Sequence, residues 1–504
     1  MAMQFKAKIF EIEQGQNEVV LNENRAKELG IEIFERVLLK TRGKEIVAIV
    51  DFSERMVKED EMALFDEVAH ALEARNDELI TLETLQRPAS LDYIKKKLDG
   101  FALSAEEIEK IIRDVNDEKL SSTELAAFIT AIYTRGFNME ETAALTNAIC
   151  NTGDILDYDG NRGIVVSEHS IGGIAGDKSS MLIVPILASL GITIPKTASR
   201  AISSGAGTAD CMEVLTKVAL SAKEIREVVK KTGGCLVWGG AVRLASADDK
   251  LIKIRKPLRL DPKPLLLASI LAKKKAEGAQ YVLIDIPCGK GAKVETAEEG
   301  KLLAQDFETL GSHLGMKVQC IISDGSEPMT SCAGPALEAK CFLSMLETKT
   351  ETPLVEKSCL MVGVVLQMTR GMSREEGYKL AMQQFRSGKA LEKFREIIEA
   401  QGGNPEVKSE NVEVGKLRAL VKSEEHGKAA HVDNKAISKI CRMLGAPSEK
   451  RAGMMLRVSK GQQIEKGEVI AELFAVSQEK LDFALSNMKK EKVVEVERII
   501  IDVV

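Results

Sequence analysis

Aromatic side chains are scarce in this chain of 504 residues: they make up 4% of it, and Trp238 is its single tryptophan. Proteins that bind single-stranded nucleic acid stack bases on aromatic side chains, and nucleic-acid-binding proteins in general carry a strongly basic surface. The formal net charge here is -6, and the sequence pI is about 5.8. We therefore expect no nucleic-acid partner, and any site for a phosphorylated ligand must be local.

Long apolar runs are also missing. The longest apolar stretch, residues 181–190, contains Pro185 and is far shorter than the roughly 20 residues that a membrane-spanning helix needs. No apolar segment of the kind found in secretory signal peptides follows Met1. These absences predict a cytoplasmic protein with no membrane partner.

The cysteines and histidines lack the spacings of a disulfide framework or a metal site. The nine cysteines are scattered with no CxxC pair, and an odd, dispersed set is typical of reduced thiols in the cytosol. The five histidines show no metal-ligand spacing either. We therefore expect reduced thiols and no metal ion.

Local patterns divide the chain into domains of different kinds. Residues 1–85 alternate polar and apolar positions in KAKIFEIE and RVLLKTRGKEIVAIVD, which predicts a small β-barrel with edge strands to cover, and Asn24 is expected to cap a short helix between them. Residues 86–160 have helical periodicity with capping boxes at Ser104 and Ser121. An apolar helical pattern returns at about 247–278 and is expected to join this helical lobe.

Short apolar runs that end in polar loops characterise residues 161–420. GIVVSEHS, YVLIDIP and KVQCIISDG are typical of buried parallel strands with ligands at their carboxyl ends. Residues 421–504 alternate helix and hairpin patterns and are expected to form a C-terminal α+β domain. The predicted fold class is α/β: a helical lobe plus a large α/β lobe with an active-site cleft between them, a small β-rich N-terminal domain and the C-terminal domain.

Two glycine-bearing, hydroxyl-rich loops, SEHSIGGIAGDKSS and SRAISSGAGTAD, flank one apolar segment. Glycine lets backbone N–H groups approach an anion closely, and serine and threonine hydroxyls can donate to its oxygens. Two such loops suggest a substrate with two anionic groups, although each loop alone is also compatible with an ordinary turn. The first loop is not a nucleotide-triphosphate loop, because Asp177 separates Gly176 from Lys178 where that motif needs lysine directly after glycine.

Three further features could carry chemistry. Asp261 precedes a proline and an apolar helix, so it is either a helix cap or, if buried, an acid that protonates a departing base. Ser269 and Lys273 share one face of that helix, which is otherwise explained as an exposed polar stripe. The turn CGKGAKV offers Lys290 and Lys293 to a phosphate or sugar, or simply to solvent.

Six motifs in order complete the sequence signal: HSIGG, PKTASRAISSGAGTAD, WGGAVRLASADDKL, LDPKPLLLASILAKK, GKGAKVET and KGQQIEKGEVIAELFA. Together they resemble the thymidine phosphorylase family, the type II nucleoside phosphorylases, from about residue 90 to the C-terminus. The extra N-terminal domain and the SRAIxSxAGTAD form are most similar to the archaeal AMP phosphorylases within that family. The resemblance implies a pentosyltransferase that converts AMP and phosphate to adenine and ribose 1,5-bisphosphate, with CMP and UMP as further substrates.

The resemblance also assigns roles to residues. It makes Asp261 the proton donor, places Arg255 and Lys273 near the base, and offers Ser170 and Ser180 to the attacking phosphate. The implied substrate-binding residues are Gly173, Ser199, Arg200, Ala201, Ile202, Ser203, Ser204, Thr208, Ser269 and Lys293. It implies AMP and phosphate as small-molecule substrates, no cofactor, no metal, and assembly into a homo-oligomer.

One position departs from the family pattern. The family usually has lysine just before HSxGG, facing phosphate, and this chain has Glu168. A carboxylate about 4 Å from phosphate would repel it by roughly 1 kcal/mol in water and by more inside a cleft. Either Glu168 points away and Lys178 compensates, or phosphate binds more weakly.

Two rival functions remain open at this point. A pyrimidine nucleoside (thymidine) phosphorylase would accept thymidine or uridine without a 5′-phosphate. A non-enzymatic carrier or assembly protein is suggested by the hairpin KGQQIEKGEVI, which resembles biotinyl and lipoyl domains. Those domains need a modifiable lysine at the tip of the hairpin, whereas Lys460 and Lys466 flank the turn.

Overall fold

The computed structural model describes residues 3–158, 163–201 and 204–497, and the chain divides into two compact units. The first unit comprises Met1–Gly153 and Ala245–Ala272, and the second comprises Asp154–Leu244 and Lys273–Val504. The chain therefore leaves the first unit, returns to it, and leaves it again. The last passage falls inside one helix, α11 (Lys263–Ala276).

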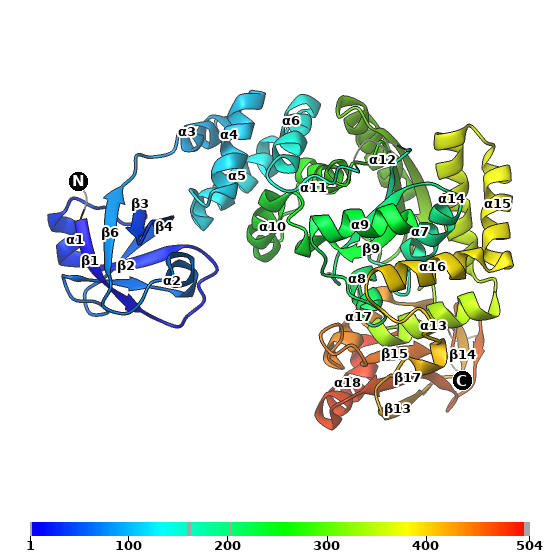
Figure 1. Cartoon of the computed structure of the whole chain (residues 1–504). Helices are drawn as coiled ribbons and strands as arrows, with labels where there is room; N and C mark the ends of the chain where they lie inside the picture. Colours follow the sequence, from blue (N-terminus) through cyan, green and yellow to red (C-terminus); the bar gives the residue numbers. More distant parts are fainter. Residues whose placement is uncertain (1–2, 159–162, 202–203, 498–504) are drawn as a thin grey trace. The chain divides into compact units, whose positions relative to one another are not determined.

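The first unit begins with a closed six-stranded barrel, drawn in blue in Figure 1, with strand order β1-β5-β2-β4-β3-β6. In its first strand Phe5 and Ala7 are buried, while Lys6 and Lys8, which follow each of them, are exposed, as the alternation predicts. The predicted small β-barrel is confirmed. The prediction that it has edge strands in need of covering is wrong, because closure pairs every strand. The strands are β1 (Met3–Ile9), β2 (Glu18–Asn22), β3 (Arg36–Thr41), β4 (Lys44–Ser53), β5 (Glu61–Leu64) and β6 (Leu79–Thr84).

Two short helices accompany the barrel, α1 (Glu23–Glu28) and α2 (Asp66–Leu72). The predicted cap of α1 at Asn24 is wrong. Asn22 is the cap, since its Oδ1 accepts hydrogen bonds from the backbone N–H groups of Asn24 and Arg25 at 3.1 and 3.3 Å. Strand β2 ends at Asn22, so the helix starts with no intervening loop.

Helices make up the rest of the first unit. The capping boxes predicted at Ser104 with Glu107 and at Ser121 with Glu124 are confirmed, which explains why α4 and α5 start where they do. Arg36 of the barrel donates to Glu124 and to the backbone oxygen of Lys119. The helices are α3 (Ser90–Leu98), α4 (Ala105–Asn116), α5 (Ser122–Arg135), α6 (Met139–Cys150), α10 (Ser246–Leu258) and most of α11.

The second unit is built on parallel strands. β7 (Val166–Ser170), β10 (Tyr281–Cys288) and β11 (Lys317–Asp324) form a parallel sheet in the order β11-β10-β7, which confirms the three strands predicted from their apolar runs. β8 (Ile194–Ala198) and β9 (Gly234–Trp238) form a parallel pair, joined to β7 by one bridge between Val165 and Thr193.

Helices surround these strands, and α14 and α15 run side by side in Figure 1. The apolar segment predicted between the two glycine loops forms α7, from Met181 to Ala188 wholly buried in the largest core. The helices are α7 (Ser179–Ser189), α8 (Thr208–Glu213), α9 (Ala222–Thr232), α12 (Ala297–His313), α13 (Pro335–Thr348), α14 (Pro353–Arg370), α15 (Arg374–Ser387) and α16 (Lys389–Ala400), with short 3-10 turns at Gly239–Ala241 and Ser409–Asn411.

The end of the second unit adds two small antiparallel sheets and two helices. One sheet has the order β12-β15-β17-β13 and the other β16-β14-β18. Helices α17 and α18 pack on them around Ile437, Ile440 and Leu473. The elements are β12 (Cys332–Ala333), β13 (Leu417–Lys422), β14 (Gly427–Val432), α17 (Asn434–Met443), β15 (Gly453–Leu456), β16 (Gln463–Ile464), β17 (Val469–Ala475), α18 (Gln478–Glu491) and β18 (Val494–Glu497).

One prediction about the cysteines is wrong. Cys332 and Cys341 are joined by a disulfide, because β12 and the first turns of α13 bring residues nine apart in sequence together. The other seven cysteines are free thiols. Among the described residues, no helix combines the length and apolar character needed to cross a bilayer.

Candidate active site

The carboxyl end of β7 carries Glu168, His169 and Ser170, at the edge of a parallel sheet where α/β proteins bind ligands. Burial first, and then the positive field of nearby lysines, holds the pKa of His169 well below its usual value. The imidazole is therefore neutral at neutral pH. The lysines that act on it are Lys196, Lys274, Lys273 and Lys293.

Glu168 is buried at this point and is ion-paired. Its Oε1 lies 3.0 Å from Nζ of Lys196 on β8, and the same lysine donates to the backbone oxygen of Glu168 at 2.7 Å. Ser180, in the first turn of α7, also donates its hydroxyl proton to Oε1. Lys196 therefore neutralises the carboxylate of Glu168, the residue at the position that the family resemblance places next to phosphate.

The structure does not favour the alternative in which Lys178 compensates for Glu168, because Lys178 has another partner. Nζ of Lys178 lies 2.7 Å from the carboxylate of Glu338 on α13, and both side chains are buried. Burial alone would lower the pKa of Lys178, but the charge and hydrogen bond of Glu338, together with other nearby groups, raise it, so Lys178 stays charged in that pair. The two charges of this buried pair neutralise each other, so the charge of Lys178 is balanced by Glu338.

Ser170, the other predicted phosphate contact, also donates to a carboxylate. Its Oγ lies 2.9 Å from Oδ2 of Asp285 on β10, and Nζ of Lys357 on α14 donates to the same oxygen at 2.7 Å. Lys357 donates to Asp177 at 2.8 Å as well, so it ties together both ends of the first glycine loop. Burial raises the pKa of Asp285, whereas Lys357 holds the pKa of Asp177 below its usual value in spite of burial.

Gly173, a predicted substrate contact, lies beside Lys293. A Cβ on Gly173 would be 3.8 Å from the backbone N of Lys293, and Gly173 has a φ of +100°, which L residues rarely adopt. The structure thus brings these two predicted site residues together in the second unit. Lys290 in the same turn instead pairs with Glu495 at 2.9 Å, and both side chains are solvated.

The second glycine loop is fastened by Asp210 at the start of α8. The carboxylate accepts the backbone N–H groups of Ala201 and Gly207 at 2.8 and 3.0 Å. Gly207 is required for this turn, because a Cβ there would lie 2.5 Å from the backbone oxygen of Ser199. Ser204 donates to the backbone oxygen of Ala206 at 2.9 Å.

The side chain of Arg200 makes ion pairs and a ring contact with other residues of the protein. Its guanidinium lies 2.6 Å from Glu213 and 3.1 Å from Asp210, and it stacks 4.6 Å from the ring centroid of Trp238. The guanidinium of Arg200 therefore already has partners within the protein. Ser199 and Thr208 lie at the two ends of this loop, and the predicted contacts Ile202 and Ser203 lie outside the described residues.

Two of the residues predicted to act on or lie near the base, Asp261 and Arg255, belong to the first unit. Asp261 precedes α11, and its Oδ1 lies 3.2 Å from Nη1 of Arg255. The acid role requires a buried carboxyl group, but the side chain of Asp261 is 44% exposed. The backbone oxygen of Pro262 accepts a hydrogen bond from the backbone N–H of Leu266 at 3.1 Å.

Ser269 is buried on α11 and donates to Asp248 of α10 at 2.6 Å. The alternative of an exposed polar stripe is therefore wrong for Ser269. Lys273, four residues on, lies beyond the division between the units.

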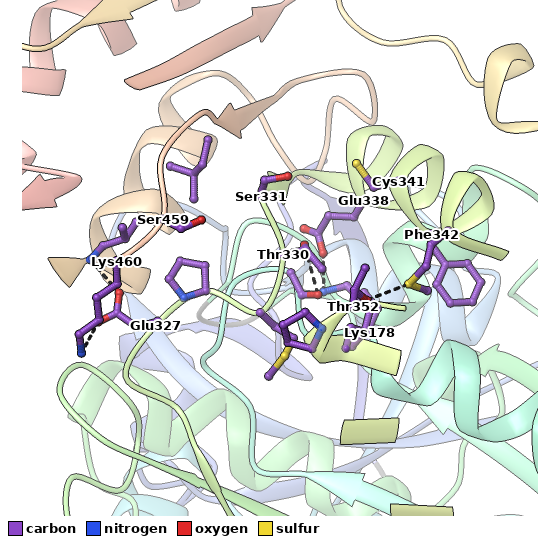
Figure 2. Close-up of a pocket in the computed structure, with 18 of the residues that line it drawn as sticks. Lys178, Glu327, Thr330, Ser331, Glu338, Cys341, Phe342, Thr352, Ser459 and Lys460 are labelled. Atoms are coloured by element: carbon purple, nitrogen blue, oxygen red, sulfur yellow. Dashed lines mark hydrogen bonds and ion pairs between the residues drawn. The ribbon is translucent and has the colours of Figure 1, made fainter. Parts of the chain in front are cut away.

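A pocket of about 470 Å³ in the second unit is lined by none of the predicted site residues. Figure 2 shows the Lys178–Glu338 pair on one side of it and Glu327 with Lys460 on the other. Phe342, Met345 and other apolar side chains form much of its wall. Gly176 and Lys178 of the first glycine loop contribute to its lining, whereas no described residue of the second glycine loop does.

Sequence reasoning missed the buried carboxylate–lysine pairs. The available signal was a charged residue inside an apolar strand, as with Lys196 in ITIPKTA and Asp285 in YVLIDIP. Charged side chains are almost never buried unless they are paired. Lys357, on a helix far along the chain, gave no comparable signal. In the part of the chain that the structure describes, no group of three or more histidine, cysteine or acidic residues is placed to hold a metal ion.

Family models match most of the chain. Residues 91–153 match the helical bundle domain of a glycosyl transferase family, and residues 162–391 match the α/β domain of that family. Residues 429–495 match the pyrimidine nucleoside phosphorylase C-terminal domain.

Similar proteins extend over nearly the full length, the barrel included. An AMP phosphorylase from Methanosarcina mazei is 44% identical over 490 residues, which cover 97% of this chain and 96% of that protein. An AMP phosphorylase from Pyrococcus furiosus is 42% identical over 503 residues, covering 100% of this chain and 99% of that protein.

Among solved structures, the anthranilate phosphoribosyltransferase of Thermus thermophilus matches with a TM-score of 0.53 at 19% identity. The match covers 62% of this chain and 99% of that one. At this level of identity the likeness concerns the fold: a helical bundle domain and an α/β domain.

Proposed function

Because the chain belongs to the thymidine phosphorylase family, in its AMP phosphorylase branch, we propose that it catalyses the phosphorolysis of AMP. The substrates are AMP and inorganic phosphate, and the products are adenine and ribose 1,5-bisphosphate. CMP and UMP are further substrates. The enzyme is a pentosyltransferase that degrades or salvages nucleotides in the cytoplasm as a homo-oligomer, with no cofactor or metal ion.

The reaction exchanges one bond at the anomeric carbon. An oxygen of phosphate forms a bond to that carbon while the bond to the base nitrogen breaks, and the electron pair of the broken bond goes to the base. The base takes up a proton, which Asp261 supplies. Phosphate gives up a proton when it becomes an ester, so atoms and charge balance. The protein holds the two substrates in line and excludes water, which would otherwise be the nucleophile.

We propose the following roles for the binding residues, which the family resemblance implies. Gly173 and Lys293 lie side by side and contact the nucleotide. The second glycine loop presents backbone N–H groups to the 5′-phosphate, since Arg200 is bound by Glu213 and Asp210. Ser170 and Ser180 contact the attacking phosphate. Ser269, fixed by Asp248, and Asp261 act on the nucleoside part.

The observation that carries the proposal is the extent of the similarity: 44% identity over 97% of the chain, including the N-terminal barrel. A nucleoside phosphorylase would need neither the barrel nor a second anion site, so the two glycine loops also favour a nucleotide. The carrier alternative is weakened because Lys460 is ion-paired with Glu327 at 3.2 Å.

The test is a phosphate-dependent base-release assay with AMP, CMP, UMP, thymidine and uridine as parallel substrates. We expect release of adenine from AMP only when phosphate is present, with ribose 1,5-bisphosphate formed in equal amount. Faster turnover of thymidine or uridine than of AMP would establish the nucleoside phosphorylase alternative instead. No release from any of the five would contradict both enzymes.

A further inference from the structure

Ser170 and Ser180, the two serines proposed to contact phosphate, each donate the hydroxyl proton to a carboxylate. Ser170 donates to Asp285 at 2.9 Å, and Ser180 donates to Glu168. A hydroxyl has one proton, and an ionised carboxylate can only accept. Neither serine therefore has a proton left to donate to an anion.

The direction of these hydrogen bonds is fixed by lysines, which can only donate. Lys357 donates to the oxygen of Asp285 that Ser170 also reaches, at 2.7 Å. Lys196 lies 3.0 Å from the oxygen of Glu168 that Ser180 reaches. Each of these oxygens therefore accepts from a lysine as well as from a serine, and the serine is the donor.

Both hydroxyls lie over the same face of the sheet. Glu168 and Ser170 are two residues apart on β7, so their side chains share a face, and Asp285 is the register partner of Ser170 on β10. Ser180 reaches this face through its bond to Glu168. Ser170 already accepts the backbone N–H of Gly172 at 3.3 Å, which leaves it one further lone pair.

The lysines that reach this face are matched by carboxylates of the protein. Lys196 lies 3.0 Å from Glu168, and Lys357 pairs with both Asp285 and Asp177. Neither lysine therefore brings an unmatched positive charge to a second anion.

We propose that this site binds its oxyanion as a hydrogen-bond donor and so selects dihydrogen phosphate over hydrogen phosphate and over sulfate. Two acceptor hydroxyls, on Ser170 and Ser180, match the two protons of dihydrogen phosphate. Hydrogen phosphate has one proton, and sulfate has none. Glu168 thus sets specificity at the phosphate subsite, where a lysine would attract any anion. The inference rests on the proposed function for its placement of phosphate at these serines.

The first test uses the unmodified protein and two probes, inorganic phosphate and sodium sulfate. Calorimetry should show sulfate binding at least about tenfold more weakly than phosphate near pH 6, because each unmatched charge-assisted hydrogen bond is worth about 1.5–3 kcal/mol. In turnover with saturating AMP, the KM for total phosphate should rise by up to about tenfold per pH unit above the second ionisation of phosphate. Sulfate that binds within threefold of phosphate, or a KM that stays flat over this range, would overturn the proposal.

The second test removes the charge of Glu168 in the variant Glu168→Gln. An amide can donate to an unprotonated oxyanion, so sulfate should bind at least about tenfold more tightly than to the wild type, and the pH dependence of the phosphate KM should flatten. The control Glu338→Gln removes a second buried glutamate, paired with Lys178 at 2.7 Å, and should leave the ratio of sulfate to phosphate binding unchanged. An equal change in both variants would contradict a specific role for Glu168.

Failure of the inference and failure of the proposed function give different results. Calorimetry measures the ratio of sulfate to phosphate binding without AMP, so it decides the inference even if no adenine is released. If adenine is released but sulfate competes as well as phosphate does, the inference is wrong and the proposed function stands. If Glu168→Gln does not fold, the measurements on the unmodified protein decide alone.

Discussion

Asp261 is the residue on which the chemistry depends most. It lies beside Arg255 in the first unit, with a side chain that is 44% exposed there. An acid that protonates a departing base must keep its proton until the bond to the base breaks. A substrate that covers Asp261 and engages Arg255 would supply the burial that the first unit alone does not.

The variant Asp261→Asn tests this role. It should lower kcat by about 10²–10⁴, because an amide cannot transfer a proton, and it should leave the Kd for AMP nearly unchanged. Asp117→Asn is a matched control, since Asp117 is a partly exposed aspartate paired with Lys119 at 2.9 Å, also in the first unit. A kcat for Asp261→Asn equal to that of the control would rule out the acid role.

Lys357 is the residue that joins the two ends of the first glycine loop, through Asp177 and Asp285. Lys357→Met should lower the free energy of unfolding of the second unit by about 3–5 kcal/mol, because it leaves two buried carboxylates without their cation. Urea denaturation followed by the fluorescence of Trp238 reports on this unit.

The control for Lys357 is a surface pair. Lys439→Met breaks an ion pair with Glu491 in which the lysine is 60% exposed, and it should cost at most about 1 kcal/mol. Similar unfolding midpoints for the two variants would show that the Lys357 cluster does not stabilise the loop.

At the scale of elements, the fluorescence of Trp238 can report on the loop between β8 and α8. Arg200 lies against Trp238, the single tryptophan, and is held there by Glu213 and Asp210. Lys450 also reaches Glu213, at 2.6 Å. Any event that releases Arg200 should therefore change the tryptophan fluorescence.

Acid titration is such an event. The hydrogen bond from Arg200 lowers the pKa of Glu213 from 4.5 to about 2, so the stability contributed by this pair is present above pH 4.5 and is lost as the pH falls towards 2. The Trp238 signal should change in that interval while circular dichroism shows whether the fold is retained. Glu213→Gln should give the acid-like signal already at neutral pH. A variant with wild-type fluorescence at all pH values would contradict the coupling.

The elements that sequence could predict are those set by local chemistry. Capping boxes at Ser104 and Ser121 and the apolar runs of β7, β10 and β11 depend only on neighbours in the chain. The partner of Glu168 could not be predicted, since Lys196 and Lys178 are both lysines close by in sequence and only the strand order places Lys196 beside it. The disulfide Cys332–Cys341 likewise depends on how α13 packs against β12.

At the scale of the whole molecule, the N-terminal barrel contributes no predicted site residue. The closed barrel contacts the helical part of its own unit through Arg36 with Glu124 and through Asn17 with Glu118. Since closure leaves no edge strand, any assembly through the barrel must use its outer surface.

A chain that starts at Leu85 tests the role of the barrel. We expect it to retain some base release but to show a much smaller mass in light scattering than the full chain, since added domains commonly supply the contacts of a symmetric oligomer. An unchanged number of subunits would show that the barrel does not drive assembly. Complete loss of turnover in a folded truncation would place the barrel in the active site.

The central claim is that this enzyme acts on a nucleotide through two anion sites. The most direct measurement is the ratio of kcat/KM for AMP to kcat/KM for adenosine, at one fixed phosphate concentration. A charge-assisted contact to the 5′-phosphate contributes roughly 1.5–3 kcal/mol, so AMP should exceed adenosine by at least about tenfold. Equal values for the two substrates would contradict the account and favour a nucleoside phosphorylase.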